Sequence, residues 1–249
     1  MNPSIPQWNI RVVIPALNEA PSIGQVISAL PEDWVTSVHV ADNGSHDETA
    51  AIAREHGDRV VREERRGYGS ACLAAIADLR KVVKSANHEV VVFLDADFSD
   101  DPSCLPQLVQ PLIHQTADLV LGNRNHSGID PRALTPQQHW GNRLATSLIY
   151  RIHKVRYRDL GPFRALRLET LDQLEMKDPD YGWTVEMQLK AARRRLRTLE
   201  VDLPYRRRIG QSKISGTISG SVRAGIKILS LILSDLVAGP RNQEKSGAN

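Results

Sequence analysis

Short apolar runs alternate with helical patterns along the first half of the chain. The runs RVVIPAL (11–17) and SVHVAD (37–42) are typical of buried parallel strands, and each is followed by a segment whose apolar residues recur every three or four positions. The same alternation predicts further strands at 58–64, 89–97 and 118–125, and helices at 21–31, 45–57 and 69–85. We therefore predict an α/β fold with a mostly parallel central sheet and helices on both faces.

The strand EVVVFLDAD (89–97) is the most apolar of these and is expected at the centre of the sheet. Beyond residue 125 the alternation is looser. Helices are predicted at 139–154 and 182–198, the second capped near Thr184, and short strands within 157–167 and 199–210. We expect one domain over 8–217, an amphipathic helix over 218–239, and a disordered tail over 240–249.

Each of the first four predicted strands ends in a polar cluster. The clusters are Asn18–Glu19, Asp42–Gly44, Glu63–Gly69 and Asp95–Asp101. Ligands of open parallel sheets bind beyond the carboxyl ends of the strands. The four clusters are therefore expected to meet in one cleft.

The segment FLDADFSDDP (93–102) places four carboxylates close together. Asp95 and Asp97 either cap the turn that follows the strand, or bind a hard divalent cation that coordinates a diphosphate. A cation would offset the repulsion between the two carboxylates, which favours the second interpretation. Asp100 and Asp101 precede a proline and are interpreted as the turn and cap that start the next helix.

The net charge of +3 conceals an uneven distribution. Acidic residues gather at 42–48 and 95–101, whereas the segment 193–208 carries RRRLR and RRR. This separation suggests a site that takes both an anionic ligand and a metal ion. Alternatively, a solvated helix face accounts for several of the first group, Arg193, Arg194, Arg195 and Arg197.

Absent motifs exclude several enzyme classes. The chain has no GxxxxGK[ST], no GxGxxG after the first strand, no HExxH and no GxSxG, which argues against a P-loop, a zinc enzyme and a serine hydrolase. GYGSA (67–71) either approaches a phosphate at a helix start or simply turns the chain. Cys72 and Cys104 are interpreted as reduced thiols of a cytoplasmic protein.

Taken together, the strand-end motifs resemble a known enzyme family. PALNE (15–19), ADNGSHDET (41–49), DADFSDDP (95–102) and GNR (122–124) are similar to motifs of the family-2 inverting glycosyltransferases. Within that family the dolichyl-phosphate mannosyltransferase-like branch is the most similar, because three later motifs follow in the same order. These are DLGPFRALR (159–167), GWTVEMQLKAA (182–192) and RRIGQSKISG (207–216).

The resemblance implies a GT-A type nucleotide-sugar-binding fold. It also implies a metal-dependent, inverting transfer of a hexose from a GDP- or UDP-sugar to a polyprenyl-phosphate-type lipid. The motifs are specific as a set, whereas each one by itself is a weak signal.

The resemblance assigns the donor site to the strand ends. It places Pro15, Leu17 and Glu19 against the nucleobase and ribose, and Asp42 where an acid reads the base or ribose. Leu17 stands where an aromatic residue is frequent, so guanine and uracil both stay open.

The metal motif is assigned in the same way. Asp95 and Ala96 match its ribose and phosphate side, and Asp97 matches the principal ligand of Mg²⁺ or Mn²⁺, with Asp95 beside it. Ser99 stands where the mannosyltransferases often carry a glutamine as an additional ligand, so Ser99 is the weakest member of the predicted set.

The remaining family positions concern catalysis. Arg124 matches an arginine that faces the donor sugar-phosphate, and Arg207 and Lys213 match a basic pair that neutralises phosphates. Fixed cations there would lower the barrier to departure of the nucleoside diphosphate. Glu186 acts as a base if the acceptor is a hydroxyl, whereas an anionic lipid phosphate needs no base and leaves Glu186 to orient neighbouring cations.

The C-terminal segment offers a route to a lipid acceptor. One apolar stripe comprises Ile218, Val222, Ile226, Leu229, Leu233 and Leu236, with Arg223 and Lys227 off it. The stripe either lies on anionic lipid headgroups or packs on the sheet or on a second subunit, as in a homodimer. The chain has no signal-peptide pattern and no apolar run long enough to cross a bilayer. We therefore expect a cytoplasmic protein with peripheral association at the inner face of the membrane.

Two further function classes are alternatives. A nucleotidyltransferase also uses paired acids on an α/β sheet, but no glycine-rich triphosphate loop with Arg or Lys follows the first strand. A nucleic-acid-binding module ranks last, because an acidic cleft repels a phosphate backbone and aromatic residues form only 5% of the chain, too few for base stacking. We therefore expect no nucleic-acid partner.

Overall fold

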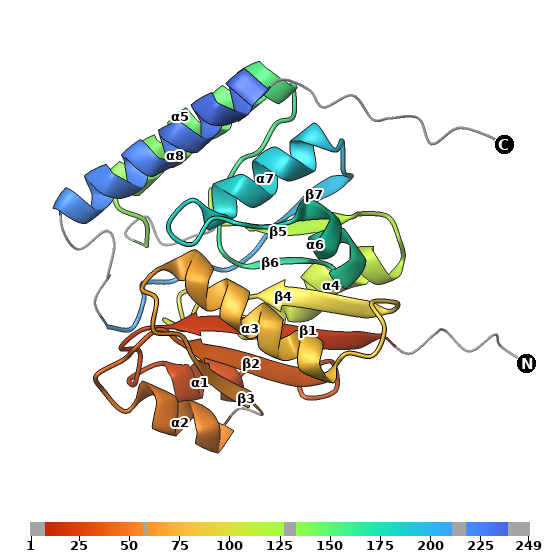
Figure 1. Ribbon diagram of the computed structural model, residues 1–249, viewed down its shortest axis with the longest axis vertical. Helices are drawn as coiled ribbons and strands as arrows, with labels where there is room; N and C mark the ends of the chain where they lie inside the picture. Colours follow the sequence, from red (N-terminus) through yellow and green to blue (C-terminus); the bar gives the residue numbers. More distant parts are fainter. Residues whose placement is uncertain (1–7, 57–58, 127–132, 211–217, 239–249) are drawn as a thin grey trace, which may run out of the picture.

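A mixed sheet runs through the molecule in the order β3–β2–β1–β4–β6–β5–β7 (Figure 1). The strands are β1 (Asn9–Ala16), β2 (Ser37–Asp42), β3 (Arg59–Arg62), β4 (Glu89–Phe93), β5 (Leu119–Asn123), β6 (Arg164–Arg167) and β7 (Thr198–Asp202). The computed structural model describes residues 8–56, 59–126, 133–210 and 218–238. β6 is antiparallel to β4 and β5, and all other pairs are parallel. The mostly parallel sheet and the central place of β4 are as predicted.

Helices cover both faces of the sheet, because successive side chains of a strand point to opposite sides. One face, which includes Val13 and Phe93, packs under α3 (Tyr68–Val82), α5 (Pro136–His153), α6 (Leu168–Leu174), α7 (Trp183–Arg193) and α8 (Ile218–Ala238). The other face, which includes Val12 and Val92, packs under α1 (Ile23–Ser28), α2 (Thr49–His56) and α4 (Leu105–Ile113). The two-sided core explains why the central strands are apolar at almost every position.

Some local expectations need correction. Asp101 accepts a hydrogen bond from Ser103 N (3.1 Å) and caps the short 3₁₀ helix Pro102–Cys104, as predicted. Asp100 does not serve the same turn. It is buried and bridges to Tyr205.

The arginine-rich end of α7 also differs from the prediction. The helix ends at Arg193, so the arginines that follow do not share a helix face. Arg193 pairs with Asp235 of α8, and Arg197 pairs with Asp118 at the start of β5. These two arginines therefore join separate elements and are not simply solvated.

α8 lies beside α5 and over α7 (Figure 1). Ile228, Leu231 and Ile232 pack against the core, whereas Ile226 (63%) and Leu233 (59%) are largely exposed. The helix therefore has a packed face and an exposed apolar face. Among the described residues no helix is both long and apolar enough to span a membrane.

Asp78 of α3 joins this helix to β2 and β3. Its Oδ2 accepts hydrogen bonds from His39 Nδ1 (3.1 Å) and Arg59 Nε (2.6 Å). Burial lowers the pKa of His39, so the ring is neutral at pH 7. The hydrogen bond from Arg59 lowers the pKa of Asp78 to about 2. A depressed carboxyl pKa contributes stability above its unfolded value of 3.8, which is lost as the pH falls toward about 2.

We predict that Asp78→Asn lowers the free energy of unfolding at pH 7 by about 2 kcal/mol, because the substitution removes a charged acceptor from a buried network. Urea denaturation measures this change. The control is Asp172→Asn, which removes the exposed partner of Arg80 and should cost less than about 1 kcal/mol. Equal losses in the two variants would contradict the role assigned to Asp78.

Candidate active site

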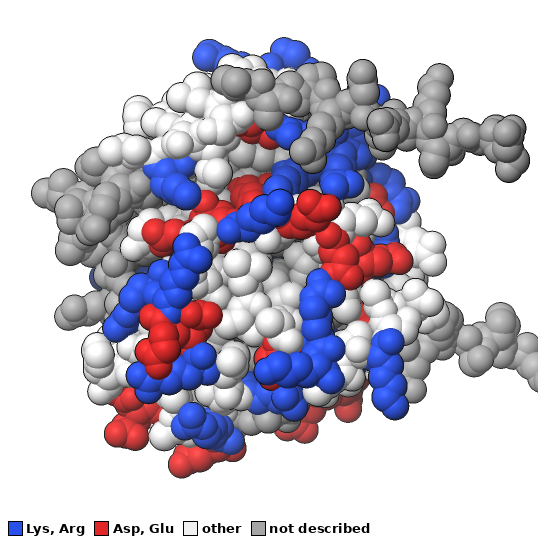
Figure 2. Space-filling view, in the orientation of Figure 1, with Lys and Arg blue, Asp and Glu red and all other residues white. Residues whose placement is uncertain are grey.

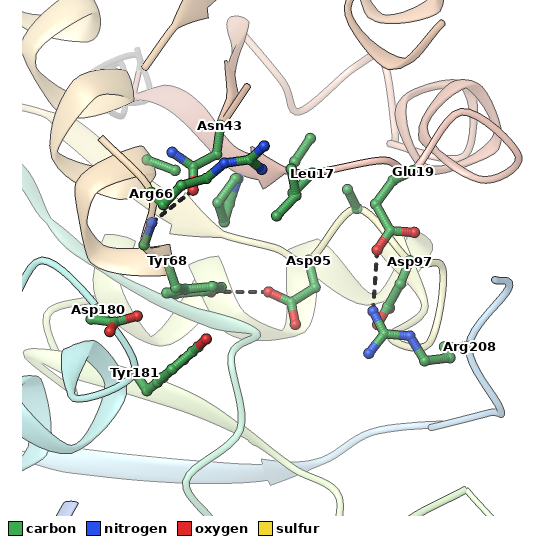
Figure 3. A pocket seen from close by; sticks show the side chains of 15 residues that line it. Leu17, Glu19, Asn43, Arg66, Tyr68, Asp95, Asp97, Asp180, Tyr181 and Arg208 are labelled. Atoms are coloured by element: carbon green, nitrogen blue, oxygen red, sulfur yellow. Dashed lines mark hydrogen bonds and ion pairs between the residues drawn. The ribbon is translucent and has the colours of Figure 1, made fainter. Parts of the chain in front are cut away.

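A cavity of about 320 Å³ opens at the carboxyl ends of β1 to β4 (Figure 3). Glu19 follows β1, Asn43 follows β2, Arg66 and Gly67 follow β3, and Asp95 follows β4. The four polar clusters therefore meet in one cleft, as predicted. The lining residues are Pro15, Ala16, Leu17, Glu19, Asn43, Arg66, Gly67, Tyr68, Ala71, Asp95, Ala96, Asp97, Asp180, Tyr181 and Arg208.

Asp95 and Asp97 are fixed by different neighbours. Tyr68 at the start of α3 donates its hydroxyl to Asp95 Oδ1 (2.9 Å). Asp97 Oδ1 accepts hydrogen bonds from Ser99 N (2.9 Å) and Ser99 Oγ (2.6 Å). Burial, and then the neighbouring Asp97, raise the pKa of Asp95. The pair is therefore a concentration of negative charge that a bound cation would stabilise.

Arg208 bridges two carboxylates of the pocket (Figure 3). Its Nη2 lies 2.9 Å from Asp97 Oδ2 and 3.2 Å from Glu19 Oε1. Both carboxylate side chains are buried, 6% exposed for Asp97 and 7% for Glu19. One guanidinium group thus links the end of β1 to the loop after β4.

The glycine-rich segment 67–71 brings α3 against a distant loop. A Cβ on Gly69 would lie 1.9 Å from the carbonyl oxygen of Asp178, so only glycine fits there. Ser70 N donates to the carbonyl oxygen of Pro179 (2.7 Å). This contact holds the loop whose next residues, Asp180 and Tyr181, line the pocket.

Asn43 organises the opposite wall. Its Oδ1 accepts a hydrogen bond from Gly67 N (2.9 Å), and its Nδ2 donates to the carbonyl oxygen of Arg65 (2.8 Å). Asn43 therefore sets the path of the chain between β3 and α3. The sequence offered a signal, since Asn43 lies in the polar cluster after β2, but the prediction singled out its neighbour Asp42.

The predicted site residues divide into two groups. Those that line the pocket are Pro15, Leu17, Glu19, Asp95, Ala96 and Asp97. Those that do not are Asp42, Ser99, Arg124, Glu186 and Arg207, and Lys213 lies outside the described residues. The individual roles of both groups stay predictions.

Two members of the second group have other contacts. Asp42 Oδ1 accepts a hydrogen bond from Ser45 N (3.0 Å), which orders the turn after β2. Arg124 makes a two-point contact with buried Asp159, from Nε to Oδ2 (2.8 Å) and from Nη2 to Oδ1 (3.0 Å). Burial opposes this charge, but the pairing with Asp159 outweighs it and raises the pKa of Arg124.

Glu186 is also held away from the pocket. Its carboxylate accepts hydrogen bonds from the backbone amides of Lys177 (3.0 and 3.1 Å) and Asp178 (2.8 Å), and Lys190 Nζ lies 2.8 Å from Oε1. These bonds tie the first turn of α7 to the loop that carries Tyr181. Glu186 therefore holds this loop in place, and its role as a base stays a prediction.

The donor set fits Mg²⁺ or Mn²⁺ bound together with a phosphate ligand. In the described part of the chain, no three His, Cys, Asp or Glu side chains are grouped to hold a metal ion by themselves. Magnesium, however, is commonly bound by one or two carboxylates, with substrate phosphates and water completing the shell. Asp95 and Asp97 supply such a pair at the pocket wall.

Comparison with known proteins agrees with this geometry. The family model described as Glycosyl transferase family 2 matches residues 11–174. A glycosyltransferase of unassigned activity from Mycobacterium tuberculosis is 37% identical over 221 residues, covering 86% of this chain and 94% of the relative. A dolichyl-phosphate hexose transferase of Haloferax volcanii is 30% identical over 233 residues, covering 91% and 95%.

Solved structures show the same fold. Glucosyl-3-phosphoglycerate synthase of Mycobacterium tuberculosis, in complex with Mn²⁺, UDP and glucosyl-3-phosphoglycerate, superposes with a TM-score of 0.71 at 23% identity. The match covers 92% of this chain and 80% of that one. The fold is of the GT-A type, as expected from the sequence. With its family match and its relatives, the chain belongs to glycosyl transferase family 2 and is a glycosyltransferase.

Proposed function

We propose that this glycosyltransferase moves a hexose from a GDP- or UDP-sugar to a polyprenyl phosphate, with inversion and with Mg²⁺ or Mn²⁺ as cofactor. The observation that carries the proposal is the distribution of charge in the pocket. Two carboxylates, the buried Asp97 and the half-buried Asp95, line the same cavity as the guanidinium groups of Arg66 and Arg208. A nucleoside diphosphate with its cation requires both, carboxylate oxygens for the cation and fixed positive charge for the phosphates.

In this mechanism each residue has a separate task. Pro15, Leu17 and Glu19 contact the nucleoside, and Asp97, with Asp95 beside it, would hold Mg²⁺ or Mn²⁺. The bound cation would neutralise charge on the diphosphate. Tyr68 holds Asp95 in place through its hydroxyl. Inversion requires the acceptor oxygen to attack the anomeric carbon from the face opposite the leaving diphosphate.

Two observations support a phosphate acceptor. An anionic phosphate oxygen needs no base. Glu186, which was expected to act as a base only on a hydroxyl acceptor, accepts hydrogen bonds from backbone amides outside the pocket. Relatives point the same way: besides the Haloferax volcanii enzyme, an undecaprenyl-phosphate mannosyltransferase of Micrococcus luteus is 29% identical over 229 residues, covering 85% of this chain and 89% of that enzyme.

A hydroxyl acceptor is the alternative; the structurally similar glucosyl-3-phosphoglycerate synthase was crystallised with UDP-glucose and phosphoglyceric acid, a molecule that carries a hydroxyl group. Glu186→Gln does not separate the two cleanly, because it also weakens the bonds that hold the loop of Tyr181. Comparing acceptors directly is more decisive. The nucleotidyltransferase alternative is dropped, since the family and the relatives are glycosyltransferases.

We predict that the protein with Mn²⁺ and a GDP- or UDP-hexose converts undecaprenyl phosphate into a lipid-linked hexose, detected by mass spectrometry. Asp97→Asn should lower this turnover at least about a hundredfold, because it removes a charged oxygen ligand, while the circular dichroism spectrum stays unchanged. Transfer to polyprenyl alcohol or phosphoglycerate, with none to the phosphate lipid, would contradict the acceptor. Full activity of Asp97→Asn would contradict the metal site.

We also propose that the outer face of α5 and α8 docks on an anionic membrane. Trp140 of α5 is 69% exposed, and Ile226, Leu233 and Leu236 of α8 are exposed too. This side of α8 is a largely white surface in Figure 2. The division into a catalytic domain of residues 8–217 and an appended helix belongs to the same proposal.

The charge of this face complements anionic lipid. The sequence of α5 contains no acid, and the only acid of α8, Asp235, is paired with His153 and Arg193. A second cavity of about 450 Å³ beside α5 is lined by Thr146, Ser147, Tyr150, Arg151, Arg156, Tyr157 and Arg158. Of these arginines, Arg158 is paired with Glu200 and Asp202. Exposed apolar side chains beside cationic side chains are typical of a peripheral membrane surface.

We predict that the double substitution Leu233→Gln with Leu236→Gln weakens sedimentation with phosphatidylglycerol vesicles about tenfold, because the apolar contribution is lost. The control Leu199→Gln changes an exposed leucine on β7 and should leave binding unchanged. A stable homodimer that binds no vesicles, and that the double substitution dissociates, would show instead that this face is a subunit interface.

A further inference from the structure

Arg208 occupies a position that conflicts with cation binding. Its Nη2 is 2.9 Å from Asp97 Oδ2, while Asp97 Oδ1 is already engaged by Ser99. A Mg²⁺ or Mn²⁺ ion bound at Oδ2 would stand about 2 Å from that oxygen. The guanidinium nitrogen and the ion would then be like charges no more than about 5 Å apart. The guanidinium group and the ion therefore compete for Asp97 Oδ2.

The backbone around Arg208 does not need to move for an exchange. Arg206 N donates to the carbonyl oxygen of Ser99 (2.9 Å), and Ile209 N donates to that of Asp97 (2.9 Å). These hydrogen bonds fix the segment 205–209 against the loop after β4. Only the Arg208 side chain, which is 32% exposed, has to swing.

Arg208 also has an unused donor. Its Nε is buried and has no hydrogen-bond partner among the residues that the structure describes. A guanidinium group forms two-point contacts with phosphate, and Arg208 lines the donor pocket. A diphosphate would therefore offer Arg208 a better set of acceptors than the single-nitrogen contacts that it makes to Asp97 and Glu19.

We infer that Arg208 is an exchangeable counter-ion of the active site. It neutralises Asp97 while no cation is bound, leaves when the cation arrives, and moves to the diphosphate of the donor. The inference rests on the proposed function only for the nature of these two ligands. Arg208 thereby couples the binding of the two ligands. Because the diphosphate takes Arg208 away from Asp97, it raises the affinity for the cation, and the bound cation in turn raises the affinity for the diphosphate.

The test is a pair of binding titrations on Arg208→Gln. Without nucleotide, the affinity for Mn²⁺, followed by electron paramagnetic resonance of the free ion, should rise about tenfold because the competing guanidinium group is gone. At saturating Mn²⁺, the affinity for UDP or GDP, measured by calorimetry, should fall about tenfold because a phosphate partner is lost. The two shifts have opposite signs, which simple damage to the pocket does not produce.

Arg206→Gln is the matched control. It removes the same charge from the same segment, but Arg206 lies over the ring of Phe98 (4.2 Å to the centroid) and 3.6 Å from Asp101. Its Mn²⁺ affinity should stay within about twofold of the unsubstituted protein. Arg208→Lys, which keeps the charge, should show both shifts in smaller degree and serves if Arg208→Gln does not fold.

The inference is wrong if Mn²⁺ affinity without nucleotide is unchanged or lower in both Arg208 variants, or rises equally in Arg206→Gln. Binding of neither Mn²⁺ nor a nucleoside diphosphate by the unsubstituted protein would instead overturn the proposed function itself. The two failures are therefore distinguishable.

Discussion

The candidate active site depends on keeping two carboxylates side by side at the end of the central strand. Asp95 and Asp97 follow the central strand, so their position is set by a core strand buried on both faces. Repulsion between the two carboxylates would favour protonation of one of them or movement of the two side chains apart. The protein offsets it with local donors, Tyr68 for Asp95 and Ser99 for Asp97, and with the guanidinium group of Arg208.

Much of the remaining architecture brings those donors to the strand end from distant parts of the sequence. Gly69 lets α3 approach the loop after α6, and Glu186 holds the same loop from the first turn of α7. The segment 205–209 pairs with the loop after β4 and delivers Arg208. The second half of the chain therefore closes a pocket whose base is built by the first half.

The sequence was sufficient for the parts of the fold that repeat. Alternating strands and helices predicted the sheet, and the parallel direction of β1 to β4 predicted that their polar ends meet. The sequence was insufficient where pairing between distant segments determines which side chain faces the pocket. Three adjacent arginines, Arg206 to Arg208, look alike in sequence. Ile209 N donates a hydrogen bond to the carbonyl oxygen of Asp97, which fixes the position of this segment. As a result Arg208 faces the Asp97 carboxylate, whereas Arg207 is exposed.

The proposed exchange at Asp97, of a guanidinium partner for a divalent cation, can be observed directly. The most direct measurement is a crystal structure with Mn²⁺ and a nucleoside diphosphate, in which anomalous scattering locates the ion. We expect Mn²⁺ about 2 Å from Asp97 Oδ2, with Arg208 moved onto the diphosphate. An ion bound elsewhere, with Arg208 still paired to Asp97, would contradict this exchange.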